Sequence, residues 1–212
     1  MYKAFLKRTI DLVLSFFGIV ILAIPMGVVA LAIKLDDPGP ALFKQKRVGQ
    51  HKVFFQLYKF RSMKMNTPDI PTHLLENPEQ YITKIGGFLR KTSLDELPQL
   101  FNIFVGDMSI IGPRAFLPTN FPGYENLKPR SQRRLDALPG ITGYCQAYYR
   151  NNATLQEKIE YDAYYVDNLS FAMDVKVLIQ TVVSVLKRDN IYVAPNEEAE
   201  KKAKDAVEAG KK

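Results

Sequence analysis

Two adjacent carboxylates, Asp95 and Glu96, stand directly before an apolar run in the segment SLDELPQLFNIFVGDM. A carboxylate can bind Mg²⁺, which usually keeps several waters and bridges phosphate oxygens. It can instead attack phosphorus as a nucleophile and form an acyl phosphate. Acidic residues are also common at the start of a helix, where their only role is a favourable interaction with the helix dipole. These two residue types therefore allow phosphoryl chemistry without establishing it.

The local sequence offers two ways to place the acidic pair. Ser93, followed by Glu96 three residues later, fits a capping box that would begin a helix at Ser93. Pro98 would then lie inside that helix and remove a backbone donor. A short buried helix that begins near Pro98 and ends at Gly106 fits better, and it leaves both carboxylates in the turn before it. A helix N-terminus is a place where anions and metal ions gather.

Basic residues outnumber acidic ones by 29 to 22, which gives a formal net charge of +7. Such a balance suits an anionic partner, which could be nucleic acid, a phospholipid surface or a phosphorylated substrate. Arginine holds phosphate through paired hydrogen bonds, and the candidates are Arg90, Arg114 and Arg150. Lys59 and Arg61 lie in the stretch KVFFQLYKFRSM, which predicts a half-buried strand with a charged outer face. Beside a membrane segment, such residues also suit headgroups or phosphates.

Several classes of chemistry lack their motifs in this sequence. One cysteine, Cys145, excludes a disulfide within the chain, and two histidines make a structural zinc site a poor interpretation. The phosphate-binding pattern G-x-x-x-x-G-K-[ST] is missing, which disfavours hydrolysis of nucleoside triphosphates. The nucleophile pattern G-x-S-x-G is also missing.

An uncharged apolar run, LVLSFFGIVILAIPMGVVALAI, occupies residues 12–33. Its length of about 22 residues is that of a transmembrane helix. Basic residues on both sides, including Lys7, Arg8 and Lys34, argue against a single crossing, because one basic flank would face the wrong side. Pro25 near the centre would kink or break the helix, so both halves could dip into one leaflet as a bent hairpin. A kinked span is the alternative, and on these residues the two remain level.

The remainder of the chain predicts an α+β domain. A Pro/Gly turn and short strand-like pieces follow the apolar run, then a loop over 66–81 with at most a short helix. Amphipathic patterns predict helices over 155–169 and 171–188. We expect a membrane segment over 1–35, a catalytic domain over 36–190 and a polar tail over 191–212, to which no function is assigned.

Five segments in order carry a specific resemblance: DDPGPALFKQKRVG, YKFRSM, GGFLRKTSLDELPQLFNIFVGDMSIIGPR, LPGITGYCQ and DVKVLIQTVVSVLKR. Together they resemble the monotopic phosphoglycosyl transferases of the bacterial sugar transferase family, in its small, PglC-type form. The resemblance implies a re-entrant membrane helix-break-helix hairpin plus a compact, mostly helical cytoplasmic catalytic domain with short strands. It also implies transfer of a sugar 1-phosphate from a UDP-sugar to polyprenol (undecaprenyl) phosphate, with release of UMP. This is the first membrane step of glycoconjugate biosynthesis.

The same resemblance implies roles for individual residues. Asp95 would be the nucleophile that forms a covalent phosphosugar intermediate, with Mg²⁺ held beside it, and Glu96 its essential partner. Residues 139–143, PGITG, would belong to the nucleotide side of the site. The segment YCQ, residues 144–146, departs from the family pattern, in which many members have an aromatic and a small residue before Gln146, and this is expected to affect packing only. The remaining implied residues are the phosphate-binding Arg90, Arg114 and Arg150, the weaker candidates Lys59 and Arg61, the helix break Pro25, and the headgroup anchors Lys7 and Arg8.

The expected partners are a UDP-sugar, polyprenol phosphate and membrane phospholipid, with no nucleic acid. The expected location is the bacterial inner membrane, with the catalytic domain on its cytoplasmic face. One alternative from another class is a non-catalytic adaptor that binds anionic membranes. A second alternative keeps the enzyme but has the lipid phosphate attack the donor directly, without a covalent step. The sequence does not indicate which sugar is carried.

Overall fold

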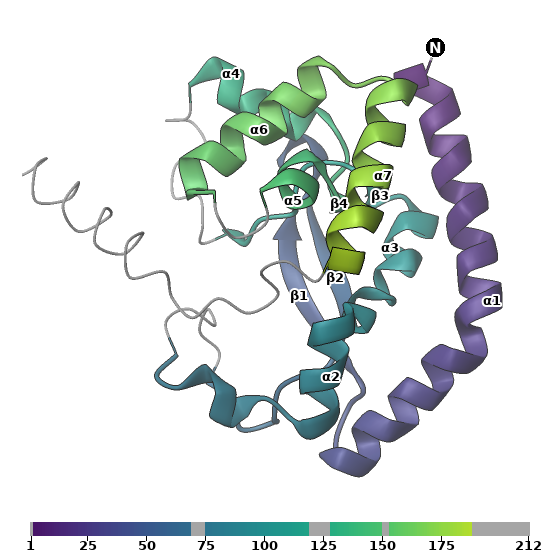
Figure 1. The fold of residues 1–212 in the computed structure, drawn as a ribbon, viewed down its shortest axis with the longest axis vertical. Helices are drawn as coiled ribbons and strands as arrows, with labels where there is room; N and C mark the ends of the chain where they lie inside the picture. The colour runs from purple at the N-terminus through teal and green to yellow at the C-terminus, as the bar shows by residue number, and fades with distance from the viewer. Residues whose placement is uncertain (1, 69–74, 119–127, 150–152, 188–212) are drawn as a thin grey trace, which may run out of the picture.

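A long helix, α1 (Lys7–Asp36), runs along one side of a body of shorter helices and strands (Figure 1). The structure is a computed structural model and describes residues 2–68, 75–118, 128–149 and 153–187. A short π-helical turn, η1 (Tyr2–Leu6), precedes α1. The body combines mainly helical elements with two small sheets, which confirms the predicted mixed, mostly helical fold.

Helix α1 continues without a break through Pro25. Among the described residues it is the one helix long and apolar enough to cross a membrane. Its axis changes direction in its second half, the half that contains Pro25 (Figure 1). Proline removes one backbone donor, and the hydrogen bonds of the neighbouring turns can hold the helix together while it bends. The structure therefore has a bent helix where the sequence predicted helix, break and helix.

The first sheet is an antiparallel hairpin of β1 (Leu42–Val48) and β2 (Phe54–Phe60), joined through η2 (Gln50–Lys52). Alternate residues of β2, Phe55 and Leu57, are buried, as expected for a strand with one face on the core. They join a cluster with Ile103 and Met108. The predicted half-buried strand is confirmed.

Four short elements follow the hairpin and lead to the acidic pair. They are η4 (Pro78–Tyr81), α2 (Lys84–Thr92), η5 (Leu94–Glu96) and α3 (Gln99–Val105). Gly106, with φ of 105°, ends α3 as predicted. Only one face of α3 is buried, whereas its Phe101 and Val105 are exposed, so the expected buried helix is buried on one side.

The second sheet pairs β3 (Ser109–Ile111) in parallel with β4 (Gly140–Thr142). Helices surround it, and the two longest, α6 (Leu155–Asp167) and α7 (Phe171–Lys187), lie within two residues of their predicted bounds. Thr154 and Glu157 form a reciprocal capping box at the start of α6. The shorter elements here are α4 (Pro129–Gln132), η8 (Arg133–Asp136) and α5 (Tyr144–Tyr148).

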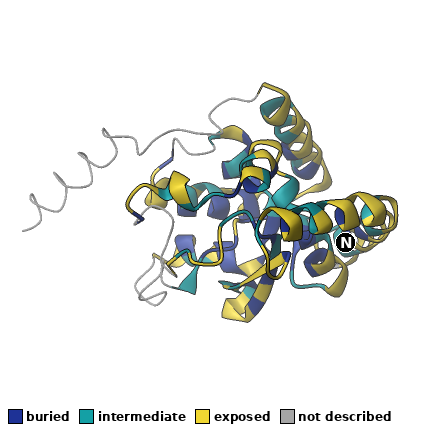
Figure 2. Cartoon of the chain, turned by 90° about the horizontal axis from the view of Figure 1, so that it is seen from below, coloured by how far each residue is buried: buried dark blue, intermediate teal, exposed yellow. Residues whose placement is uncertain are grey.

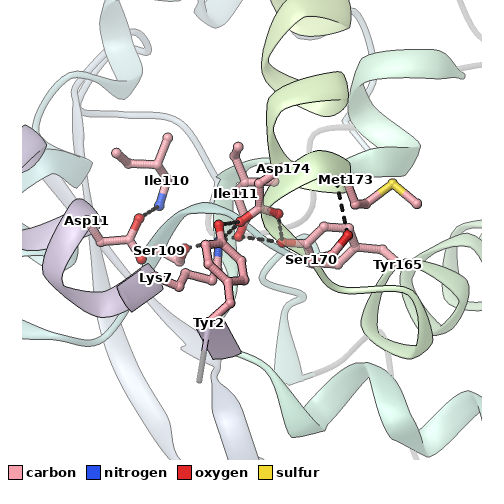
Figure 3. Close-up of polar contacts among 10 residues, drawn as sticks. All are labelled: Tyr2, Lys7, Asp11, Ser109, Ile110, Ile111, Tyr165, Ser170, Met173 and Asp174. Atoms are coloured by element: carbon pink, nitrogen blue, oxygen red, sulfur yellow. Dashed lines mark hydrogen bonds and ion pairs between the residues drawn. The ribbon is translucent and has the colours of Figure 1, made fainter. Parts of the chain in front are cut away.

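The N-terminal end of α1 is fastened to the body by Asp174 of α7 (Figure 3). Tyr2 Oη and Lys7 Nζ donate to Asp174 Oδ2 at 2.5 and 2.6 Å, and Tyr165 Oη donates to Oδ1 at 2.5 Å. Arg8 donates to the carbonyl of Ile103 at 2.5 Å, at the end of α3. Both cations thus bind acceptors within the protein, and their expected role as headgroup anchors stays a prediction.

The C-terminal end of α1 is fastened to the same body. Ile85 N donates to Asp36 Oδ2 at 2.9 Å, which ties the helix to α2. Arg61 Nη1 donates to Asp37 Oδ2 at 2.8 Å, and its Nη2 donates to the Asp37 carbonyl. Arg61 is nearly buried in this contact. In this structure its guanidinium closes the end of α1, and phosphate binding by Arg61 stays a prediction.

The outer face of α1 is exposed along most of its length (Figure 2). Its large exposed side chains are apolar, and α7 adds a second exposed apolar face. An exposed apolar surface of this kind marks a membrane or partner interface. The exposed apolar residues of the two helices include Leu14, Phe17, Val20, Ile21, Ile24, Val28 and Leu31 of α1 and Leu178, Ile179, Val182, Val185 and Leu186 of α7.

Candidate active site

The acidic pair lies in the tight turn between α2 and α3. Ser93 ends α2 in the left-handed conformation, with φ of 58°, and the next residues form the 3₁₀ turn η5. Pro98 then caps the N-terminus of α3. This confirms that Asp95 and Glu96 precede a helix that begins near Pro98. The capping-box alternative is wrong, because Ser93 makes no side-chain capping bond and stops the preceding helix instead.

Lys59 reaches the acidic pair from strand β2. Its Nζ lies 2.6 Å from Glu96 Oε1, and both side chains are partly exposed. Asn102 of α3 holds the strand in register, since its Oδ1 accepts from Tyr58 N at 3.0 Å and its Nδ2 donates to Gln56 O at 2.7 Å. The sequence indicated Lys59 as a weaker phosphate ligand, but the structure pairs it with Glu96. Asn102 gave no signal beyond being a polar residue in an apolar run.

The two neighbouring carboxyls have different environments. Burial raises the pKa of Asp95 above its usual range, although the charges of Lys59 and Arg90 oppose this rise. Burial acts on Glu96 in the same direction, but the pKa of Glu96 is nevertheless lowered by the charges of Lys59 and Arg114. Adjacent carboxyls whose pKa values are moved apart are typical of sites in which each has its own role.

Two of the predicted arginines contribute charge to this turn. Arg90 lies in the last turn of α2, where its Nη2 is 3.7 Å from Met63 Sδ. Its charge acts to lower the pKa of Asp95, against the effect of burial. Arg114 follows β3 and has an exposed side chain, and its charge helps to lower the pKa of Glu96. Arg150 lies outside the described residues.

Arg47 of β1 is a further basic residue that the sequence analysis missed. Burial and the charge of Arg114 lower the pKa of Arg47 to about 10, while the charge of Glu96 acts in the opposite direction. Its Nη1 donates to the carbonyl of Ala115 at 3.0 Å. Arg47 pairs across the hairpin with the buried Phe55, so strand alternation alone could have placed it on the inner face.

The glycines near the site bring backbones together. A Cβ at Gly86 would lie 2.0 Å from the carbonyl oxygen of Ser62, and one at Gly140 would lie 2.1 Å from Gly112 N. Gly86 thus packs α2 against the chain that follows β2, where no side chain would fit. The motif 139–143 contributes β4, and its nucleotide role stays a prediction.

The residues present fit a Mg²⁺ ion only in combination with a substrate. No group of three or more histidine, cysteine, aspartate or glutamate side chains in the described part of the chain could hold a metal. Mg²⁺ is commonly held by one or two carboxylates plus substrate phosphates and waters, and Asp95 suits that role. Glu96 is less suited, because Lys59 occupies one of its oxygens.

Comparison of the sequence with known proteins identifies the family of this chain. Residues 2–188 match the family described as bacterial sugar transferase. An undecaprenyl-phosphate galactose phosphotransferase of Salmonella typhimurium is 38% identical over 203 residues, which cover 89% of this chain and 42% of that protein. The exopolysaccharide production protein PSS of Rhizobium leguminosarum bv. phaseoli is 40% identical over 193 residues, covering 86% of this chain and 96% of that protein.

A third relative carries a more explicit name. The UDP-glucose:undecaprenyl-phosphate glucose-1-phosphate transferase of Escherichia coli strain K12 is 37% identical over 183 residues, covering 84% of this chain and 39% of that protein. This chain thus spans less than half the length of the Salmonella and Escherichia proteins and nearly all of the Rhizobium protein. A family match over most of the sequence, together with these identities, shows that the chain belongs to the bacterial sugar transferase family.

Proposed function

We propose that the protein transfers a sugar 1-phosphate from a UDP-sugar to undecaprenyl phosphate and releases UMP. The observation that carries this proposal is the turn in which Asp95 and Glu96 meet Lys59, with Arg90 and Arg114 supplying positive charge. Two relatives are named for transfer to undecaprenyl phosphate, and one of them is named for a UDP-sugar donor. A cluster of cations beside a carboxylate suits a diphosphate donor.

Asp95 is the proposed nucleophile. A carboxylate oxygen of Asp95 attacks the phosphorus that bears the sugar, the bond from this phosphorus to the UMP oxygen breaks, and UMP leaves. A phosphate oxygen of undecaprenyl phosphate then attacks the same phosphorus, so that the bond to Asp95 breaks and the carboxylate is restored. The raised pKa of Asp95 supports this role, because a more basic carboxylate is a better nucleophile. Glu96 and Lys59 hold the turn and its charge balance.

Mg²⁺ is the proposed cofactor, with Asp95 as its protein ligand. When bound it would neutralise charge on the donor diphosphate. The arginines would bind the remaining phosphate oxygens.

The proposed membrane arrangement is re-entrant, with the body on the cytoplasmic face of the bacterial inner membrane. Both ends of α1 bind the same body, through Asp174 and Arg8 at one end and Asp36 and Asp37 at the other. A straight span would need one of these ends to leave the body and cross the bilayer. A bent helix with its apolar outer face in one leaflet keeps both sets of contacts.

The donor sugar would be found by the same assay that tests the reaction. UMP release is measured with a panel of UDP-sugars, undecaprenyl phosphate and Mg²⁺, for the native protein and for Asp95→Asn. We expect one donor to give UMP with the native protein and none with the variant. If both proteins are silent with every donor while the native protein still binds anionic vesicles, the membrane-adaptor alternative is the better account.

A further inference from the structure

The segment that carries Arg114 is held by backbone contacts and, beyond them, by charged side chains. Arg114 forms an isolated parallel bridge with Gly140, and the carbonyl of Pro113 accepts from Gly140 N at 2.9 Å. Strand β3 ends at Ile111, three residues before Arg114. The carbonyl of Arg114 accepts from Arg134 Nη2 at 2.6 Å, and the next carbonyl, of Ala115, accepts from Arg47 Nη1 at 3.0 Å. Arg134 therefore binds the backbone of a residue whose own side chain is exposed at the site.

Arg134 is bound to a buried carboxylate at the same time. Its Nε and Nη2 lie 3.3 and 2.8 Å from Asp162 Oδ2, and its guanidinium carbon lies 4.0 Å from the centre of the Phe116 ring. Arg134 and Asp162 are 3% and 1% exposed, so almost no water reaches either charge. The pair connects η8 with α6, and the third partner of Arg134, the Arg114 carbonyl, belongs to neither.

A buried ion pair is weak evidence for stabilisation. Removing two charges from water costs free energy that their attraction often fails to offset, so apolar replacements of both partners are frequently neutral or stabilising. Burial also raises the pKa of Asp162, despite the opposing charge of Arg134, which agrees with a net cost for ionising this carboxyl inside the protein. A role in geometry explains the pair better than a role in stability, because planar guanidinium donors fix the direction of several acceptors at once.

We propose that the buried Arg134–Asp162 pair is a positioning device for Arg114, which fixes the backbone of that residue so that its guanidinium is held ready for a diphosphate. The inference rests on the proposed function and extends it to residues that do not touch the substrate. Asp162 orients Arg134, Arg134 holds the Arg114 carbonyl, and the exposed Arg114 side chain meets the anion. Supporting contacts of this kind commonly decide whether a binding group is held closely enough to act.

The test measures the affinity of the full-length protein for UDP, which requires no turnover. The main variant is the double replacement Arg134→Met with Asp162→Val, which removes both charges and changes the total side-chain volume little. We expect it to melt close to the native temperature and to bind UDP about tenfold more weakly, a change of about 1.4 kcal/mol. Arg133→Gln is the matched control, because Arg133 is adjacent but pairs with Asp167 at the surface, and its UDP affinity should equal the native value.

A coupling measurement separates positioning from a general structural effect. In an Arg114→Gln background, the double replacement should weaken UDP binding no further, because its effect passes through Arg114. Additive losses, or a stable double variant with native affinity, would overturn the proposal. If the double variant does not fold, Arg134→Lys serves, since it keeps the charge but loses the planar fork, and native UDP affinity in that variant would also overturn it.

The result that would contradict the proposed function differs from the result that would overturn the positioning proposal. A native protein that binds UDP but releases no UMP from any donor would contradict the transferase and leave the positioning result intact. A native protein without measurable affinity for UDP would overturn the positioning proposal itself.

Discussion

Asp95 and Glu96 are adjacent in sequence, but their pKa values are shifted in opposite directions. Glu96 is bonded to Lys59, and its lowered pKa keeps it ionised, whereas burial makes Asp95 the more basic carboxylate. A lowered native pKa means that ionised Glu96 stabilises the fold above its unfolded pKa of about 4.3, and that this contribution is lost as the pH falls through its native pKa. In the proposed reaction, Asp95 is thus the reactive group and Glu96 a structural one.

Lys59→Met should move the acidic limb of the pH–rate profile to higher pH. The charge of Lys59 lowers the pKa of both carboxyls, so its removal raises both, and a larger fraction of Asp95 is protonated and inactive at any given acidic pH. A shift of about one pH unit is expected from the loss of an adjacent opposite charge. UMP release measured across acidic and neutral pH, for the native protein, Lys59→Met and the charge-preserving Lys59→Arg, provides the check. An acidic limb that stays in place in Lys59→Met would refute this assignment.

At the scale of elements, local patterns predicted structure well and long-range partners poorly. The helices α6 and α7 were predictable because their apolar spacing and the Thr154 cap lie within the segments themselves. The acidic partners of Arg61 and Lys7 could not be predicted, because Asp37 and Asp174 lie 24 and 167 residues away. A sequence shows that a cation is present, but only the fold shows which acceptor it meets.

The same holds for the residues of the site: those placed by a local turn could be predicted, and those placed by distant contacts could not. Asp95, Glu96 and the helix beginning at Pro98 follow from turn chemistry in one short segment. Asn102 and Arg47 were missed because their roles depend on how the hairpin packs against α3 and against the segment after β3.

The placement of α2, which ends at the acidic turn, can be tested with its glycine pair. A Cβ at Gly86 would lie 2.0 Å from the Ser62 carbonyl oxygen, whereas one at Gly87 would lie 3.9 Å from Ile82 Cγ2. Gly86→Ala should therefore destabilise the protein by about 1–3 kcal/mol, as overpacking does. Gly87→Ala should stabilise it by about 0.5–1 kcal/mol, because alanine favours a helix. Thermal unfolding of the two variants gives the comparison, and equal melting temperatures would show that α2 is packed differently.

At the scale of the whole molecule, α1 links an apolar outer surface to the body that carries the site. Asp11 Oδ1 accepts from the backbone of Ile110 at 3.0 Å, on strand β3, and Tyr165 Oη donates to the carbonyl of Ile111 at 3.1 Å (Figure 3). The membrane helix and α6 thus hold the same strand, which leads to Arg114. In the proposed re-entrant arrangement, the bilayer position of α1 would set the height of the site above the membrane.

The re-entrant arrangement predicts that both ends of α1 are reached from one side of the membrane. Single replacements Lys3→Cys and Lys34→Cys, at exposed positions, should react with a membrane-impermeant maleimide in inverted vesicles and not in spheroplasts. The native Cys145 gives little background, because it is buried and burial raises its pKa to about 11. Labelling of the two ends from opposite sides would establish a span.

The central claim is that Asp95 carries the sugar phosphate between donor and lipid, and intact-protein mass spectrometry tests it most directly. The native protein is mixed with its UDP-sugar and Mg²⁺ in the absence of undecaprenyl phosphate. We predict a mass increase equal to one sugar phosphate, present in the native protein, lost when the lipid acceptor is added, and missing in Asp95→Asn. A native protein that gains no mass from the donor, yet releases UMP as soon as the lipid is present, would contradict the covalent step and establish direct transfer.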